Sequence, residues 1–369
     1  MKKHLVLVGG GHAHMVTLAN LAAIKAKGHE VTVIGPSDYH YYSGMGPGML
    51  SGFYKPEDIR FATRHVVEKQ GCKFIRDKVV RADPAGKKVF LQSGGDISYD
   101  VVSFNAGSYV PTPGQPMEGK DVFSVKPIER LLQARDRLVE LTADRKISVA
   151  VVGGGPAAAE IAGNISALVK KAAFQPSITV FAGRNFMSRF PEAIRGKARQ
   201  TLVSRGIRII EEGYVSQVDS GRVVLDSGQS YDVDFIMLAT GVRPSMIFKE
   251  SGLPVGPDGG LLVNSYLQSP ECPEIFGGGD CIYFQDRPLD KVGVYAVREN
   301  PVLYHNLVAA LEGRSLQSFD PGGDYLLVFN MGDGIGILRK KWLQFNGRLA
   351  FRVKDYIDRK FMREFQAME

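Results

Sequence analysis

The chain has 369 residues and a formal net charge of +7, with 44% hydrophobic and 23% charged residues. These proportions are ordinary for a globular protein and exclude a low-complexity chain, and the length suits two or three domains. No run approaches the roughly 18 consecutive apolar residues of a membrane-spanning helix, and the apolar segment after the basic N-terminus is too short for a signal peptide.

The cysteines and the basic residues narrow the classes of protein further. Cys72, Cys272 and Cys281 form no C-x-x-C pair, so we expect free thiols, a cytoplasmic location and no metal site. The basic residues are scattered until the C-terminus, and no nucleic-acid motif accompanies them. We therefore expect anionic cofactors or a membrane surface, and not nucleic acid, as binding partners.

The first predicted element is a strand over residues 5–8, which leads through Gly9 and Gly11 into a helix over residues 15–26. A strand, a glycine turn and a helix in this order are typical of a dinucleotide-binding site, because the glycines let backbone N–H groups approach a pyrophosphate. The helix N-terminus then stabilises the negative charge. The chain therefore begins with a predicted nucleotide-binding unit.

Two positions depart from the usual pattern of such a unit. His14 replaces the third glycine of G-x-G-x-x-G, which predicts a wider helix–strand spacing or a polar contact there. Its neighbour His12 is a candidate cofactor contact, with a packing role as the alternative. The second predicted strand, over residues 31–34, ends at Gly35, where an acidic residue would usually hold a ribose hydroxyl.

An antiparallel ribbon is predicted between residues 87 and 102, and it returns the chain to a core strand that ends near Ala106 and Gly107. Prolines and glycines are then concentrated in residues 111–119, which indicates a crossing into a second domain. We place the first domain boundary between residues 115 and 116.

A second glycine turn follows the strand predicted over residues 148–152. Gly153, Gly155 and Ala158 match G-x-G-x-x-A, and a helix is expected over residues 158–171. One such turn is a weak signal. Two in one chain indicate two bound nucleotides.

The strand predicted over residues 178–181 ends near Arg184, without the acidic residue that selects NADH. Arg184 would instead meet the 2′-phosphate of NADPH, or it lies free in solvent. The sequence therefore leaves the choice between NADH and NADPH open.

A third turn, over residues 273–280, ends in Asp280, and together with the two glycine turns it indicates a flavin and a second nucleotide. The predicted fold is α/β, with two Rossmann-like dinucleotide-binding domains of three layers (ββα), the second inserted in the first, and a small C-terminal α+β segment. The expected domains are an FAD-binding domain (1–115 and 240–315), an NAD(P)H-binding domain (116–239) and a C-terminal segment (316–369).

The C-terminal segment ends in a predicted basic amphipathic helix over residues 349–368. Its apolar residues at helical spacing are Leu349, Val353, Tyr356, Ile357, Phe361, Phe365 and Met368. The helix either docks this stripe on the core or lies in a membrane interface, where its basic rim would meet anionic headgroups.

The order of the three turns and five further stretches carry a family resemblance. The stretches are residues 9–14, 42–48, 125–128, 293–298 and 355–362. In these the chain resembles the two-dinucleotide-binding-domain flavoproteins of the pyridine nucleotide–disulfide oxidoreductase superfamily. The resemblance covers essentially the whole chain and is closest to type II NADH dehydrogenases and to the flavoprotein module fused ahead of selenophosphate synthetase.

The resemblance implies that residues 42–48 pass beside the flavin ring, where disulfide reductases carry a redox cysteine pair. This chain has no cysteine there, so electrons must leave the flavin directly. The resemblance also implies that Asp280 bonds a ribityl hydroxyl and that Glu160 lies near the nicotinamide, although a helix-end charge is an alternative for Glu160. A helix beginning near Lys291 would point its N–H groups at the flavin, and Lys126 would add a positive charge or lie at the surface.

The candidate site residues fall into two groups. Glu160 and Lys126 are the candidate catalytic residues. The candidates for binding FAD and NAD(P)H are Gly9, Gly11, His12, Ser43, Gly44, Met45, Pro47, Ala106, Gly107, Gly153, Gly155, Ala158, Arg184, Gly241, Gly279, Asp280, Val292, Gly293 and Tyr295.

We therefore expect an enzyme with non-covalent FAD that takes a hydride from NAD(P)H and passes electrons to a quinone-like acceptor. One alternative is a protein, sulfur or selenium acceptor, as in proteins similar to sulfide:quinone oxidoreductases. The other is a non-enzymatic flavin-binding protein with a decayed nicotinamide site. The sequence does not decide whether the protein lies peripherally on the cytoplasmic face of the membrane or whether it forms a homodimer.

Overall fold

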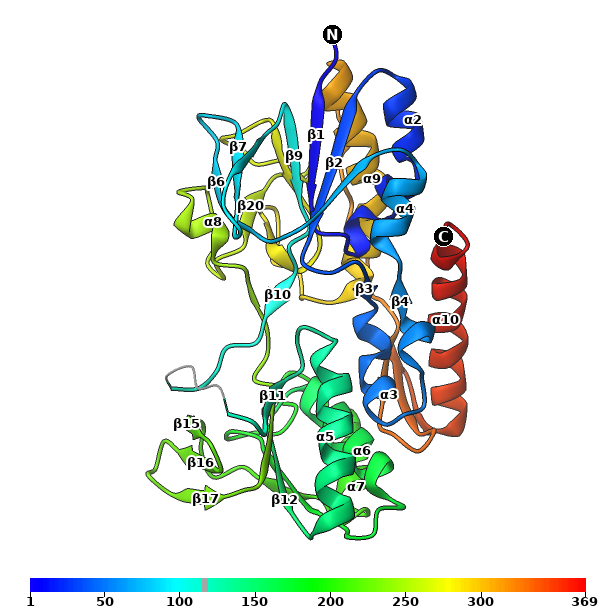
Figure 1. Ribbon diagram of the computed structural model, residues 1–369. Helices are drawn as coiled ribbons and strands as arrows, with labels where there is room; N and C mark the ends of the chain where they lie inside the picture. Colours follow the sequence, from blue (N-terminus) through cyan, green and yellow to red (C-terminus); the bar gives the residue numbers. More distant parts are fainter. Residues whose placement is uncertain (115–118) are drawn as a thin grey trace.

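The computed structural model describes residues 1–114 and 119–369 and contains two five-stranded parallel sheets, one in each half of the molecule (Figure 1). The predicted boundary at residues 115 and 116 lies outside the described residues. The first sheet has the order β21-β9-β1-β2-β5. Its strands are β1 (His4–Val8), β2 (Glu30–Gly35), β5 (Lys73–Arg76), β9 (Val101–Phe104) and β21 (Ile275–Gly277).

The first sheet is the middle of three layers. Helices cover one face and an antiparallel ribbon covers the other, so apolar side chains on both faces of β1 and β9 are buried (Figure 1). The helices are α1 (Met15–Ala19), α2 (Leu21–Ala26), α4 (Thr63–Lys69) and α9 (Gly293–Glu312). The ribbon consists of β6 (Val79–Asp83), β7 (Lys88–Leu91) and β8 (Asp96–Ser98).

The helix predicted over residues 15–26 is divided into α1 and α2 at Asn20, so that prediction was wrong in its continuity. The Asn20 side-chain amide donates to the backbone carbonyl of Val16 at 2.8 Å. An asparagine that bonds the backbone in this way competes with helical hydrogen bonding and favours a helix end.

The second sheet repeats the three layers in the other half of the molecule. Its order is β11-β18-β12-β13-β14, with helices on one face and the ribbon β15-β16-β17 on the other (Figure 1). The strands are β11 (Val122–Ser124), β12 (Ser148–Val152), β13 (Ser177–Phe181), β14 (Arg208–Ile210) and β18 (Phe235–Leu238). The covering elements are α5 (Arg130–Asp144), α6 (Pro156–Val169), α7 (Glu192–Val203), β15 (Val215–Asp219), β16 (Arg222–Leu225) and β17 (Ser230–Asp232).

Two short antiparallel strands, β10 (Ser108–Tyr109) and β19 (Arg243–Pro244), pair where the chain leaves the first half and returns to it. The returning chain forms α8 (Ile247–Glu250), β20 (Leu261–Val263) and β22 (Ile282–Phe284) before α9. The two predicted Rossmann-like units are therefore both present as sheets with covering helices.

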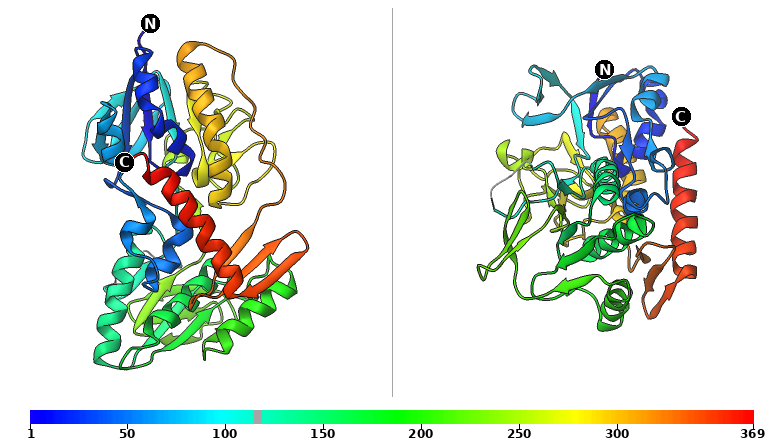
Figure 2. Two further views of the ribbon diagram at one scale, coloured as in Figure 1. Left: turned by 90° about the vertical axis from the view of Figure 1, so that its right-hand side faces the viewer. Right: turned by 60° about the horizontal axis from the view of Figure 1, so that its bottom comes forward.

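The C-terminal segment adds a small sheet and a long helix that joins the two halves. β23 (Leu327–Asn330), β24 (Gly336–Lys340) and β25 (Leu343–Gly347) form the sheet, and α10 (Arg348–Gln366) follows. α10 contacts this sheet beside the second half and also β4 (Arg60–Phe61) of the first half (Figure 2). One core cluster includes residues of α3 (Gly46–Leu50), α6 and α10, so the two halves share a packed interface.

Candidate functional site

A cavity of about 2130 Å³ lies where the two halves meet and reaches both glycine turns. Most of the predicted site residues line it. They are Gly9, Gly11, His12, Ser43, Gly44, Pro47, Ala106, Gly107, Lys126, Gly153, Gly155, Glu160, Gly241, Gly279, Asp280, Val292, Gly293 and Tyr295. Met45 and Ala158 are instead fully buried in the core, and Arg184 lies outside the lining with an exposed side chain.

The first glycine of each turn lies against the backbone of a neighbouring loop. A Cβ on Gly9 would lie 2.2 Å from the backbone oxygen of Asn105, and a Cβ on Gly153 would lie 2.1 Å from the backbone oxygen of Ala239, so neither position accepts a side chain. A Cβ on Gly155 would meet nothing within 4 Å, because this position faces the open cavity. The backbone of the second turn is therefore open to the cavity at Gly155.

His14 makes the polar contacts that its place in the first turn predicted. Its ring nitrogens lie 2.7 Å from the backbone oxygen of Gly9 and 2.8 Å from Ser103 Oγ. Burial lowers the pKa of His14 to about 4, so the ring is neutral at pH 7. The prediction of a polar contact is confirmed, and His14 joins the turn to strand β9 inside the protein.

His12 is held in an aromatic group beside α10. Its ring stacks on Phe361 with centroids 5.4 Å apart, and its Nδ1 lies 3.3 Å from His40 Nε2. Burial lowers the pKa of His12 to about 4. Its Nε2 atom is buried and has no hydrogen-bond partner in the described chain, and the residue lines the large cavity.

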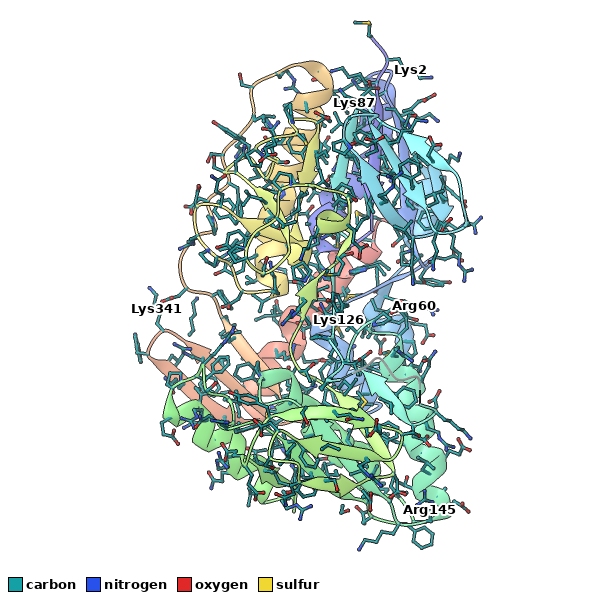
Figure 3. The ribbon with its side chains drawn as sticks, turned by 90° about the vertical axis from the view of Figure 1, so that its left-hand side faces the viewer. Lys2, Arg60, Lys87, Lys126, Arg145 and Lys341 are labelled. Atoms are coloured by element: carbon teal, nitrogen blue, oxygen red, sulfur yellow. The ribbon has the colours of Figure 1, made fainter. Side chains whose placement is uncertain are left out.

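Asp280 is the centre of a buried polar group that draws on both halves. Its Oδ2 accepts hydrogen bonds from Lys126 Nζ at 2.6 Å and from Ser108 Oγ at 2.8 Å. Burial works to raise the pKa of Asp280, but Lys126 and Ser108 outweigh it and the net shift is downward. Lys126 comes from the second half, and Figure 3 shows it between the two halves. The lysine that the sequence placed near a flavin is thus paired with the aspartate of the third turn.

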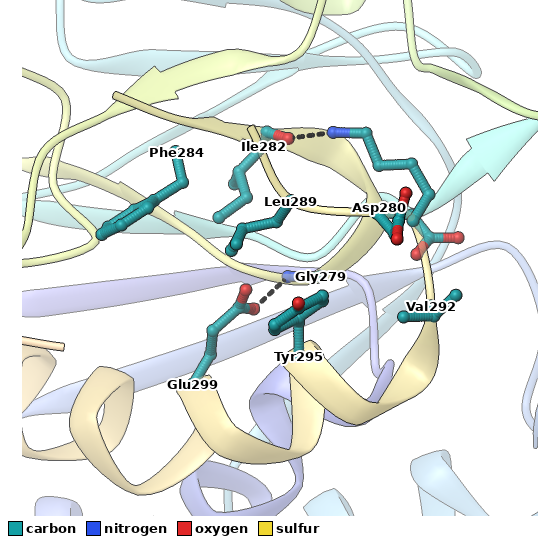
Figure 4. Close-up of a pocket in the computed structure, with 10 residues that line it drawn as sticks. Gly279, Asp280, Ile282, Phe284, Leu289, Val292, Tyr295 and Glu299 are labelled. Atoms are coloured by element: carbon teal, nitrogen blue, oxygen red, sulfur yellow. Dashed lines mark hydrogen bonds between the residues drawn. The ribbon is translucent and has the colours of Figure 1, made fainter. Parts of the chain in front are cut away.

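The N-terminus of α9 lies beside this aspartate (Figure 4). Val292, Gly293 and Tyr295 line the large cavity there, and Glu299 lies one turn further along the helix. Unpaired backbone N–H groups in the first turn of a helix favour negative charge, so this end of the cavity suits an electron-accepting group.

A second polar group in the cavity lining surrounds Glu160. Glu160 accepts a hydrogen bond from the backbone N–H of Asn330 at 2.7 Å. Burial raises its pKa to about 7, against the opposing effects of the Lys354 charge and the Asn330 bond. A carboxyl group with a pKa near 7 can both hold and give up a proton at neutral pH.

Lys354 and Asp358 of α10 belong to this second group and were missed by sequence reasoning. Lys354 Nζ donates to Asp358 Oδ2 at 2.7 Å and to the backbone oxygen of Gly44 at 2.8 Å, and both side chains are buried. Tyr42 also donates to Asp358, at 3.1 Å. The available signal was a lysine and an aspartate four residues apart among the apolar positions of an amphipathic helix, which is an unusual place for charge.

Arg184 lies at the end of β13, as predicted, but it points into solvent. Its guanidinium is 3.6 Å from Asp226 and stands over the ring of Tyr214 at 5.8 Å. Tyr214 is 60% exposed and lines the large cavity. Arg184 therefore lies outside the cavity lining, whereas Asn185, Ser188 and Arg189 of the same loop line it.

The apolar stripe predicted on the C-terminal helix is divided between two environments. Phe361 and Phe365 pack against the shared core cluster, with ring centroids 4.8 Å apart. Leu349 and Tyr356 are each 64% exposed on the outer face, near the hairpin that carries Trp342, itself 86% exposed. Docking on the core, one of the two alternatives for this stripe, is therefore seen for Phe361 and Phe365, and membrane contact of the outer face stays a prediction. No described helix is both long and apolar enough to span a bilayer.

Comparison with known proteins agrees with this geometry. A family model described as pyridine nucleotide-disulphide oxidoreductase matches residues 3–309. Ferroptosis suppressor protein 1 of Xenopus tropicalis is 26% identical over 360 residues, covering 93% of this chain and 88% of that protein. Type II NADH:quinone oxidoreductase of Staphylococcus saprophyticus is 26% identical over 387 residues, covering 97% of this chain and 94% of that protein.

Solved structures share the fold at lower identity. The sulfide:quinone oxidoreductase of Aquifex aeolicus superimposes with a TM-score of 0.81 at 19% identity, covering 100% of this chain and 92% of that one. NDH2 of Plasmodium falciparum in complex with NADH gives a TM-score of 0.81 at 15% identity, covering 100% of this chain and 98% of that chain.

Proposed function

Because the chain belongs to the pyridine nucleotide-disulphide oxidoreductase family, we propose that it is an FAD-dependent oxidoreductase that takes a hydride from NAD(P)H and reduces a quinone-like acceptor. The observation that carries the proposal is the single cavity that both glycine turns share. Bound at the two turns, a flavin nucleotide and a nicotinamide nucleotide would meet inside it. The quinone reductases among the relatives support the choice of acceptor.

The cysteines favour direct electron transfer from the cofactor. None of the residues that line the cavity in the described chain is a cysteine. Cys281 is fully buried, and burial raises its pKa to about 12, so its thiol is a poor nucleophile. A redox disulfide as intermediate carrier is therefore not part of the proposal.

The residues at the first turn and at α9 fit a flavin nucleotide. The backbone of Gly9 and Gly11 faces the cavity next to Asp280, whose pKa is lowered, so a carboxylate is available to accept a hydroxyl hydrogen bond. We propose that these residues hold FAD non-covalently and that Gly153 and Gly155 hold NAD(P)H. Flavin supplies the hydride and electron chemistry. The protein supplies position, charge and exclusion of water.

We propose that Glu160 holds a proton on the acceptor side of the cavity. Its pKa of about 7 lets it carry or release that proton at neutral pH. Lys354 lines the same cavity and is held by Gly44 and Asp358, and we propose that its remaining N–H donates toward the space where an acceptor oxygen would gain electrons. We assign Lys126 to positioning Asp280, because its charge is compensated by that carboxylate.

Anaerobic mixing of the purified protein with NADH or NADPH tests the proposal. The flavin absorption should bleach, and quinones should then restore it faster than a one-electron protein acceptor or a sulfur or selenium compound. If the flavin bleaches but a protein, sulfur or selenium acceptor restores it faster than quinones do, the proposed acceptor class changes accordingly. Bound flavin that neither nicotinamide cofactor reduces would favour the non-enzymatic alternative.

Substitution of Asp280 by alanine should weaken flavin binding. The change removes a charge-assisted hydrogen bond worth about 1.5–3 kcal/mol, which corresponds to a loss of roughly 10- to 150-fold in affinity. It also leaves Lys126 without its carboxylate partner. Flavin content after gel filtration and titration of the apoprotein measure the effect. Unchanged retention of flavin would remove Asp280 from the cofactor site.

Substitution of Arg184 by alanine should separate the two nicotinamide cofactors. We propose that NADPH binding draws Arg184 from Asp226 to the 2′-phosphate, because β13 ends without a competing acid. The KM for NADPH should then rise about tenfold while that for NADH stays constant. An equal effect on both cofactors, or none, would show that Arg184 does not contact a 2′-phosphate.

We further propose the predicted domain division, with FAD binding by residues 1–115 and 240–315, NAD(P)H binding by residues 116–239 and the segment 316–369 at the acceptor side. Within that segment we propose peripheral membrane contact through the outer face of α10 and Trp342. Exposed apolar residues beside Lys341, Arg348 and Arg352 match the chemistry of an anionic bilayer surface.

A further inference from the structure

Glu299 is a buried carboxyl group next to the turn that carries Asp280. Its side chain is on α9 and is 1% exposed. Its Oε2 accepts a hydrogen bond from the backbone N–H of Gly279 at 2.5 Å (Figure 4). Burial raises the pKa of Glu299 to about 7, against the effect of that hydrogen bond, so both protonation states are accessible at neutral pH.

A cavity of about 10 Å³ adjoins Glu299, which is the room that one water molecule needs. Asp280, Lys291 and Tyr295 line this small cavity and also the large one, so the two spaces are neighbours across the start of α9. A water in the small cavity would give Glu299 a partner for proton exchange.

Two of the charged groups around Glu299 are paired with opposite charges. Asp280 pairs with Lys126 at 2.6 Å, and Lys291, at the start of α9, pairs with Asp258 at 2.8 Å. Cys281, from the same turn as Asp280, has its pKa raised and stays a thiol. Asp290 also lines the small cavity, but it is exposed to solvent and accepts a hydrogen bond from the Tyr325 hydroxyl at 3.3 Å. Within the described chain Glu299 forms no salt bridge, and so it is the buried acidic group here whose charge has no fixed counterion.

We propose that Glu299 takes up a proton when electrons enter the large cavity at the α9 end, and releases it when they leave. This inference rests on the proposed function, in which NAD(P)H supplies the two electrons and the acceptor removes them. New negative charge beyond the helix start disfavours a second negative charge nearby in a poorly solvated site. One proton from solvent then forms an O–H bond on the carboxylate, and the same bond breaks on reoxidation.

The midpoint potential of the holoprotein between about pH 5.5 and 9 tests this coupling in wild type and in Glu299→Gln. The glutamine keeps an oxygen that can accept the Gly279 hydrogen bond but does not titrate. At acid pH both proteins carry a neutral side chain, and their potentials should coincide. As pH rises through 7, only wild type gains a negative charge, so its potential should fall below that of the variant. The difference should grow by up to about 30 mV per pH unit for one proton and two electrons.

Glu312→Gln is the matched control. It makes the same chemical change at the other end of α9, roughly 20 Å along the helix, where Glu312 pairs with Lys27. Its potential should follow wild type at every pH. Parallel curves for wild type and Glu299→Gln across the whole range would overturn the proposal.

Infrared difference spectra of wild type provide a second readout that needs no stable variant. Reduction should produce the C=O band of a protonated carboxyl group at pH 7.5, and the band should be absent from Glu299→Gln when that variant folds. A wild-type spectrum without this band contradicts the proposal. Failure of the proposed function is distinguishable from failure of this inference. In that case the purified protein would contain no flavin, or NAD(P)H would not reduce its flavin.

Discussion

Replacement of Gly155 by valine is expected to abolish reduction by NAD(P)H while leaving the protein folded and its flavin bound. Gly155 has an ordinary extended backbone, with φ −91° and ψ −179°, and a Cβ there meets no atom within 4 Å. Valine therefore fits the apoprotein but occupies the space where a pyrophosphate would approach the backbone. The rate of anaerobic reduction should fall on the order of a hundredfold or more, because the nicotinamide would be displaced from its reacting position.

Dithionite reduction provides the internal control for this variant, because it needs no nucleotide and should proceed as in wild type. Gly196→Val is a matched second control on α7, since a Cβ on Gly196 also meets no atom within 4 Å and this residue does not line the cavity. Reduction of Gly155→Val by NAD(P)H at the wild-type rate would show that the nicotinamide cofactor binds somewhere else.

Replacement of both Phe361 and Phe365 by aspartate is expected to destabilise the protein strongly. Both rings pack into the core cluster that the two halves share, and Phe361 also stacks on His12. Two carboxylates in this apolar environment should cost roughly 2–4 kcal/mol each and lower the melting temperature by roughly 10 °C. Thermal unfolding followed by calorimetry measures the shift.

The outer face of the same helix supplies the comparison. Leu349→Asp with Tyr356→Asp changes two residues that are each 64% exposed, and its melting temperature should stay close to that of wild type. If this face and Trp342 bind a membrane, the same variant should lose co-sedimentation with anionic vesicles. Wild type that does not co-sediment at low salt would exclude the proposed membrane contact.

Sequence reasoning located both Rossmann-like units because their signals are local. A buried apolar strand followed by glycines and a helix is determined by a dozen consecutive residues, and β12 has the predicted bounds. The strand predicted over residues 178–181 and the helix start near Lys291 differ from the structure by only one or two residues. Local structure that depends only on the residues of one short segment can be predicted from a single sequence.

The contacts that cross the molecule were not predictable in the same way. Lys126 and Asp280 are separated by 154 residues, and their pairing depends on how the two halves meet. Lys354 and Gly44 are 310 residues apart, and their contact depends on where α10 docks. A helical pattern shows that α10 has an apolar face, but it does not show which angular part of that face is covered. The pattern therefore did not predict that Val353, Phe361, Phe365 and Met368 are partly buried while Leu349, Tyr356 and Ile357 are exposed.

The docking of α10 also affects how ligands can enter and leave. The helix contacts the C-terminal sheet at one end, and at the other Gln366 donates to backbone oxygens of Glu57 and Arg60 in the first half (Figure 2). Together with the paired crossing strands β10 and β19, it ties the halves at two separate places. A hinge rotation that opened the cavity would have to break one of these ties. We therefore expect substrates to enter and leave through permanent openings of the cavity, without rotation of the two halves. Solution scattering should then give nearly equal radii of gyration for the free and the nucleotide-bound protein.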